Sequence, residues 1–188
     1  MSCNLLNHMH IAFQNIHKAH PTDISVLPNV HSFIQSVNMN ILHDTSAQPG
    51  QLLARGVARY LSGLGFVSLE EFVPARGLRL DLFALGSKGE LWIIECKSSR
   101  VDFTSDSKWQ NYLEWGDRFF WAVDGDFPTD ILPIDTGLMI GDAYDAALIR
   151  EAPHHPVAPA RRKALIQKFA TKAAERLWRL RDPDFTSW

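Results

Sequence analysis

Three charged residues in otherwise apolar stretches are the best candidates for chemistry in this sequence of 188 residues. Glu95 and Lys97 are separated by one residue, so on a β-strand both side chains would point to the same face. Asp81 lies in the preceding apolar stretch. Charged side chains are seldom placed in buried strands without a task. The three residues therefore form the candidate site.

The turn between the two stretches decides whether these side chains meet. Residues 87–89 end in a glycine and suit a three-residue hairpin loop, with Gly89 in the left-handed conformation that such loops favour. This loop would place Asp81 directly opposite Glu95, on the same face of the hairpin. A two-residue loop would shift the register by one residue and send the two carboxylates to opposite faces.

Two carboxylates at this spacing predict a metal ion. Directly opposed strand residues have Cβ atoms only about 4.5–5.5 Å apart, so ionised Asp81 and Glu95 would repel unless a cation lay between them. Mg²⁺, or Mn²⁺ in its place, suits these carboxylates together with the backbone carbonyl of Cys96. A water on the metal would be more acidic than bulk water, and Lys97 beside it would orient or deprotonate this nucleophile.

A simpler interpretation of the same charges is a pair of ordinary ion pairs. The expected register places Arg79 opposite Lys97, so these two cations could neutralise Asp81 and Glu95 across the hairpin. A lone Glu-x-Lys would usually be explained in this way. We favour a functional site because an Asp and a Glu-x-Lys share one apolar hairpin.

The elements that must position these residues follow from hydrophobic periodicity and turn residues. The expected elements are a helix at 51–64, strands at 66–73, 78–85 and 90–97, a helix at 108–116, strands at 118–123, 137–141 and 146–150, and a helix at 160–180. The segment 99–106 is expected to supply a loop and a helix N-cap. This order predicts an α/β fold with a mixed β-sheet flanked by helices and a long C-terminal helix. We expect one domain at 49–182, an accessory arm at 1–48 and a tail at 183–188.

Composition and charge exclude several classes of protein. The formal net charge is −2, so the chain is not a generally basic nucleic-acid coat, but eight basic residues face one acid between 161 and 181. Any contact with a polyanion should use this part, unless it is only a solvated helix face. Two distant cysteines and the lack of a long apolar run predict a cytoplasmic protein without a membrane span.

Several blocks of sequence together resemble a known family. These blocks are residues 81–86, 93–99, 108–109, 117–120 and 159–164, which read DLFALG, IIECKSS, KW, DRFF and PARRKA. They are similar to the bacterial MmcB-like DNA-repair proteins, within the PD-(D/E)XK nuclease superfamily. The resemblance implies a restriction-endonuclease-like fold, DNA and repair proteins as partners, and Asp81, Glu95 and Lys97 as the metal-binding and catalytic residues. It leaves the oligomeric state open.

The resemblance also suggests secondary candidates and shows one departure. Related nucleases often place Lys, Gln or Tyr groups near the scissile phosphate on the helix after Glu-x-Lys, where this chain has Lys108 and Gln110; the alternative is a solvated helix face. Many members carry a Glu on the first helix, but residues 51–64 contain no acid. Gln51, or Glu70 and Glu71 on the next strand, could take its place. A non-catalytic DNA-binding or repair-scaffold module therefore remains the alternative to a Mg²⁺-dependent nuclease.

Overall fold

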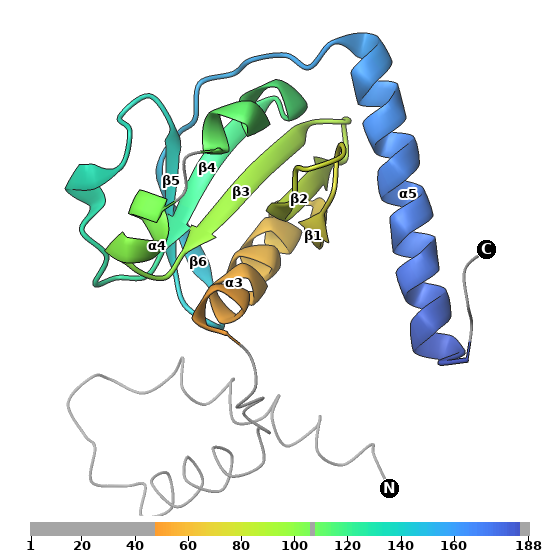
Figure 1. Cartoon of the computed structure of the whole chain (residues 1–188), viewed down its shortest axis with the longest axis horizontal. Helices are drawn as coiled ribbons and strands as arrows, with labels where there is room; N and C mark the ends of the chain where they lie inside the picture. The colour runs from red at the N-terminus through yellow and green to blue at the C-terminus, as the bar shows by residue number, and fades with distance from the viewer. Residues whose placement is uncertain (1–47, 106–107, 185–188) are drawn as a thin grey trace, which may run out of the picture. The chain divides into compact units, whose positions relative to one another are not determined.

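The computed structural model describes residues 48–105 and 108–184, so the arm predicted at 1–48 lies almost entirely outside the described residues (Figure 1). The elements are α3 (Pro49–Gly63), β1 (Phe66–Phe72), β2 (Leu80–Gly86), β3 (Leu91–Lys97), α4 (Arg100–Ser105), η1 (Trp109–Trp115), β4 (Arg118–Val123), η2 (Thr129–Ile131), β5 (Gly137–Gly141), β6 (Ala146–Arg150) and α5 (Pro159–Arg181). No described helix is both long enough and apolar enough to cross a membrane.

Within the described residues, six strands form one sheet in the order β1-β2-β3-β4-β5-β6. The β3–β4 and β4–β5 pairs are parallel and the other three pairs are antiparallel. The parallel pairs require a crossover, and α4 and η1 lie in the connection between β3 and β4. This mixed sheet, flanked by helices and followed by the long helix α5, confirms the predicted α/β fold.

The β2–β3 hairpin has the predicted register. Leu82 pairs with Ile94 and Leu85 with Leu91, as the expected three-residue loop requires. Gly89 has φ +87°, and its N–H donates to the carbonyl of Gly86 at 2.9 Å. The left-handed conformation at Gly89 therefore sets the register of the paired residues, which extend as far as Leu82 and Ile94.

The two faces of the sheet bury different cores. Helix α3 covers one face, where Val57 and Leu61 pack with Ile94 and Cys96. On the other face, Trp121 and its neighbours pack beneath η1 and α5, whose buried side chains include Tyr112, Leu165 and Phe169. Cys96 thus points away from Lys97 and into the core under α3, as expected from strand alternation.

The segment between β3 and β4 differs from the sequence-based expectation. The predicted helix at 108–116 is the 3₁₀-helix η1, and its aromatic residues Trp109, Tyr112 and Trp115 recur at the three-residue period of that helix. The segment expected to be a loop at 99–106 contains α4. Ser99 Oγ accepts a hydrogen bond from the N–H of Asp102 at 3.2 Å and so caps the first turn of α4.

The start of β2 also differs. The expected strand at 78–85 begins at Leu80, so Arg79 precedes the strand and does not pair across from Lys97. Instead, Arg79 lies 3.7 Å from Glu71, and both side chains are more than half exposed. An exposed ion pair of this kind contributes little to stability.

Asp117 joins three parts of the chain at the start of β4. Its buried carboxylate accepts hydrogen bonds from the N–H of Leu91 at 2.8 Å and of Val157 at 2.9 Å. Arg162 of α5 donates to both carboxylate oxygens, at 2.7 and 2.5 Å, and also to the carbonyl of Gly89 at 2.7 Å. Burial alone would raise the pKa of Asp117, but these hydrogen bonds outweigh it and hold the pKa below its ordinary value of 3.8.

We expect Asp117→Asn to lower the free energy of unfolding by about 3 kcal/mol at pH 7, because it leaves Arg162 without its buried anion. The folded pKa of Asp117 is depressed, so its stabilisation is present above pH 3.8 and is lost as the pH falls through the folded pKa. The deficit of the variant should therefore shrink in acid. Urea denaturation at pH 7 and in acid measures the free energy of unfolding of Asp117→Asn and of the control variant Asp126→Asn, whose side chain is exposed. Equal stability of the two variants at pH 7 would contradict the role of Asp117.

Candidate functional site

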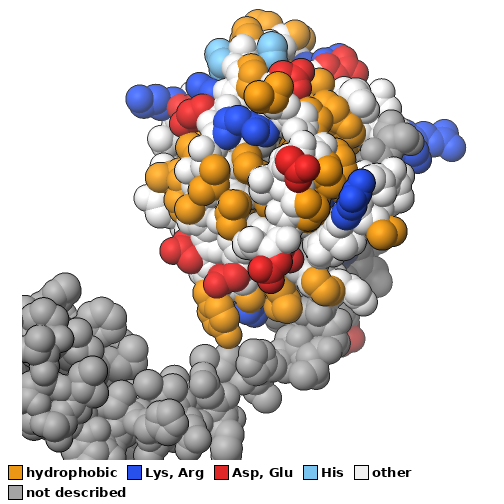
Figure 2. Space-filling view, turned by 90° about the vertical axis from the view of Figure 1, so that its left-hand side faces the viewer, with side chains coloured by type: hydrophobic (Ala, Val, Ile, Leu, Met, Phe, Trp, Pro, Cys, Tyr) orange, Lys and Arg blue, Asp and Glu red, His pale blue; other side chains and the backbone are white. Residues whose placement is uncertain are grey.

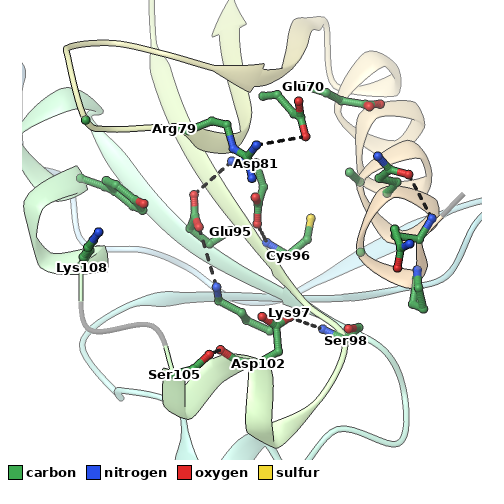
Figure 3. A pocket seen from close by; sticks show the side chains of 18 residues that line it. Glu70, Arg79, Asp81, Glu95, Cys96, Lys97, Ser98, Asp102, Ser105 and Lys108 are labelled. Carbon is green, nitrogen blue, oxygen red and sulfur yellow. Dashed lines mark hydrogen bonds and ion pairs between the residues drawn. The ribbon is translucent and has the colours of Figure 1, made fainter.

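A pocket of about 630 Å³ opens where β2 and β3 separate (Figure 3). Its volume lies in the range of ligand-binding sites. The start of α3, the end of β1, the adjoining ends of β2 and β3, α4 and η1 all contribute to its walls. The charged lining residues are Glu70, Glu71, Asp81, Glu95 and Asp102, with Arg79, Lys97 and Lys108. Five acids and three bases give the pocket an excess of negative charge.

At Asp81, side-chain hydrogen bonds replace the backbone pairing of the hairpin. The paired residues of β2 and β3 extend as far as Leu82 and Ile94. Beyond that point, the N–H of Cys96 donates to Asp81 Oδ2 at 2.9 Å, and the N–H of Asp81 donates to Glu95 Oε1 at 3.2 Å. Each carboxylate therefore accepts a hydrogen bond from the backbone of the neighbouring strand, in the opening between β2 and β3 (Figure 3).

Lys97 and Glu95 form a buried ion pair on the same strand. The exposed fraction is 3% for Glu95 and 6% for Lys97, and Lys97 Nζ lies 4.0 Å from Glu95 Oε2. Lys97 Nζ also lies 5.7 Å from the centre of the Trp121 ring. The ammonium is thus held between a carboxylate and an aromatic face. The ion-pair interpretation holds for Glu95 and Lys97, whereas Arg79 pairs with Glu71.

The electrostatics of the pocket disfavour a second negative charge beside Glu95. Burial raises the pKa of Asp81 above its ordinary value of 3.8. The Cys96 N–H and Lys97 lower this pKa, and the charge of Asp102 raises it, with burial prevailing. Burial and the charges of Asp81 and Glu95 likewise raise the pKa of the Cys96 thiol well above its ordinary value. A cation in the pocket would relieve this excess of carboxylate charge.

The metal ion expected at Asp81 and Glu95 stays a prediction. Among the described residues, no group of three or more His, Cys, Asp or Glu side chains is arranged to hold a metal. A metal at Asp81 and Glu95 would therefore need backbone carbonyl and water ligands, which Mg²⁺ readily takes. In an antiparallel ladder, the N–H and carbonyl of one residue lie on the same edge of the strand. The Cys96 carbonyl thus lies on the edge from which its N–H reaches Asp81.

The structure separates the two secondary candidates. Lys108 lines the pocket, whereas Gln110 is exposed and is not part of its wall. The three-residue turn of η1 explains this difference, because residues two apart cannot share a face of a 3₁₀-helix. Tyr112, one turn after Trp109, is buried and lines the pocket. The roles expected for Lys108 and Gln110 remain predictions.

Other lining residues were missed because their segment was expected to be a loop. Ser98, Asp102 and Ser105 belong to α4 or its approach, and Asp102 Oδ2 accepts a hydrogen bond from the N–H of Ser98 at 3.3 Å. The sequence does contain a signal for the start of α4, because Ser99 followed three residues later by Asp102 is a helix-capping pattern.

The residues proposed to replace the absent helix acid also lie in the pocket wall. Gln51 of α3 lines it, together with Glu70 and Glu71 of β1. Glu71 has φ +49°, an uncommon conformation for a residue with a side chain, and occurs in β1 between the pairs Glu70–Leu82 and Phe72–Leu80. The end of β1 therefore departs from regular strand geometry beside Asp81.

We expect Asp81→Asn to raise the melting temperature in EDTA by about 2–4 °C, equivalent to roughly 1 kcal/mol. Because the folded pKa of Asp81 is raised, its ionisation at higher pH costs folding free energy, and Asn can still accept the Cys96 N–H. Added Mg²⁺ should stabilise the wild type but not the variant. Thermal unfolding measures both effects, with Asp126→Asn as the control. A Mg²⁺ response that is equal in wild type and variant would exclude Asp81 as a ligand.

Comparisons with known proteins identify the family of this chain. A solved structure described as SPO1766, a protein of unknown function from Silicibacter pomeroyi, is 66% identical and matches with a TM-score of 0.74 over 75% of this chain and 97% of its own. No curated protein matches. The family model of the DNA repair protein MmcB-like family matches residues 38–184, which include every described strand and helix. The chain therefore belongs to the MmcB-like family of DNA repair proteins.

Proposed function

We propose that this chain hydrolyses DNA phosphodiester bonds during repair, in a Mg²⁺-dependent PD-(D/E)XK nuclease-type site. The observation that carries the proposal is the placement of Asp81, Glu95 and Lys97 together where the β2–β3 pairing ends. Membership of a DNA-repair family supports DNA as the substrate. Oligomeric state and protein partners are not part of the proposal.

Asp81 and Glu95 would hold Mg²⁺, or Mn²⁺, together with the carbonyl of Cys96. Their carboxylates already lie side by side, because each accepts a hydrogen bond from backbone on the neighbouring strand. The Cys96 thiol is directed into the core and its pKa is raised, so only the carbonyl of this residue suits a hard ion. When bound, Mg²⁺ supplies positive charge that polarises the phosphate and makes a bound water more acidic.

Lys97 is the candidate for handling the attacking water. Its Nζ is buried and held between Glu95 and the Trp121 ring, so its position is defined before substrate binds. From there its ammonium can orient the water and offset negative charge that develops on phosphorus, or, after losing a proton itself, the neutral amine can take the proton of the water. Lys108 also lines the pocket and is proposed as a second cation for the phosphate.

The charge of the pocket explains why a metal is needed for DNA to enter it. Five acids and three bases line the pocket, so a phosphate would meet net repulsion in their presence. A divalent cation between Asp81 and Glu95 would offset this excess of negative charge. Binding of the scissile phosphate and binding of the metal are therefore expected to be coupled.

The rival function is a DNA-binding or repair-scaffold module that keeps the nuclease fold without cutting. One observation favours it. The wall of the pocket formed by the first helix contributes Gln51 and not an acid, so side-chain ligands for a metal are few in the described part of the chain.

We expect purified protein to cleave DNA with Mg²⁺ or Mn²⁺ and not in EDTA. Duplex, nicked, branched and single-stranded substrates should be compared. Lys97→Ala and Asp81→Asn should each lower the rate by about 100-fold or more, the usual cost of removing a group that stabilises the transition state. Lys88→Ala, at the exposed hairpin turn, is the matched lysine control and should retain activity.

Cleavage that survives in both site variants would place the activity elsewhere or in a contaminant. Salt-sensitive DNA binding without metal-dependent cleavage would favour the rival function. If the wild type neither binds nor cuts DNA, the hairpin charges are structural ion pairs.

A further inference from the structure

Four basic residues of α5 lie on one side of the helix. Lys168, Lys172, Arg176 and Arg179 are spaced by four, four and three residues, which aligns them along the helix. We call them the α5 basic stripe. The one acid on this part of the helix, Glu175, lies 2.6 Å from Lys172 Nζ. The stripe therefore carries a net positive charge along the second half of α5.

Two members of the stripe contact the edge of the sheet next to the pocket. Arg176 donates to the carbonyl of Glu70 at 2.6 Å, and Lys168 donates to the carbonyl of Pro74 at 3.2 Å. Glu70 belongs to the edge strand β1 and lines the pocket, and Figure 1 shows α5 on this side of the sheet. Both acceptors are neutral carbonyls, so these bonds position the two cations without cancelling their charge.

The other basic residues of the molecule are used or distributed differently. At the start of α5, Arg161 pairs with Glu114 at 2.9 Å and Arg162 pairs with Asp117, so their charges are offset by buried or neighbouring acids. On the side seen in Figure 2, Lys and Arg side chains are scattered singly among acidic and apolar ones. The four aligned cations of the second half of α5 thus differ from the paired arginines at its start and from the scattered basic side chains seen in Figure 2.

We propose that the α5 basic stripe binds the phosphates of the DNA strand that leads into the pocket. The proposal rests on the proposed function, because it takes DNA as the substrate of that pocket. The eleven helical steps from Lys168 to Arg179 span about 16 Å. One DNA strand has a phosphate about every 3.4 Å along the helix axis, so the stripe matches roughly four or five phosphates. These contacts position the strand without reading its sequence.

The same helix supplies a matched control for this surface. Lys172 and Arg179 lie on the stripe, whereas Lys163 and Arg181 lie on roughly the opposite side of α5, and all four are exposed. The double variants Lys172→Gln/Arg179→Gln and Lys163→Gln/Arg181→Gln remove the same charge from the same helix. Equal melting temperatures would show that both variants are folded to the same extent.

Binding is measured by fluorescence anisotropy of a short labelled duplex in EDTA, between about 50 and 200 mM salt, so that no DNA is cut. Each phosphate contact adds about 0.9 to the slope of log affinity against log salt concentration. The stripe variant should therefore lose about 2 from this slope, with a weakened affinity, and the control variant should match the wild type.

An unchanged slope in the stripe variant, an equal loss in the control, or a wild type that does not bind DNA would overturn the proposal. The two proposals fail separately. Metal-dependent cleavage by the wild type with no effect of the stripe variant on the salt slope would leave the nuclease and remove the stripe. A reduced salt slope in the stripe variant without cleavage by the wild type would leave the stripe and remove the nuclease.

Discussion

The contact of Arg162 with Asp117 and Gly89 holds together the parts of the structure that position the site. One guanidinium bonds both oxygens of a buried carboxylate and the carbonyl of the hairpin turn. The same carboxylate accepts the N–H of Leu91, at the start of β3, and of Val157, before α5. The turn that sets the β2–β3 register is thus tied to β4 and to the long helix. A slip of one residue in this hairpin would separate Asp81 from Glu95.

The site itself lies where the regular backbone pairing of β2 and β3 ends. Beyond Leu82 and Ile94, the backbone of each strand bonds to a carboxylate on the other, and Glu71 of β1 adopts a left-handed conformation nearby. Burying carboxylates in this opening costs stability, as the raised pKa of Asp81 indicates. Such a cost is typical of sites where a ligand supplies the missing charge. The Arg162–Asp117 contact lies at the other end of β3, where the sheet is regular. The stability that this contact contributes can offset the stability lost by burying the carboxylates.

The sequence was sufficient for the parts of this structure that depend on local pattern. Gly89 predicted the turn, the turn predicted the register, and the apolar runs predicted β4, β5 and β6 with their observed bounds. Prediction failed between β3 and β4. There, the helix predicted at 108–116 is a 3₁₀-helix, and the segment predicted as a loop and N-cap at 99–106 contains the capped helix α4.

The importance of Asp117 could not be predicted from the sequence for a different reason. It follows a glycine at the start of a strand, a place where an acid is usually solvated. Only the tertiary structure brings Arg162, which is 45 residues away in sequence, to its carboxylate. The same limitation applied to Arg79, whose predicted partner depended on a strand that begins one residue after it.

Charge is divided within the molecule in a way that follows from these contacts. The first basic residues of α5 neutralise acids and fasten the helix, whereas the later ones bond to neutral carbonyls at the rim of an acidic pocket. Under the two proposals, a polyanion would approach the stripe without a metal and would enter the pocket once a cation offsets Asp81 and Glu95. DNA binding and access to the site would then be separate steps, the first sensitive to salt and the second to divalent metal. Under the proposed function, this separation would let a protein with a formal net charge of −2 act on DNA.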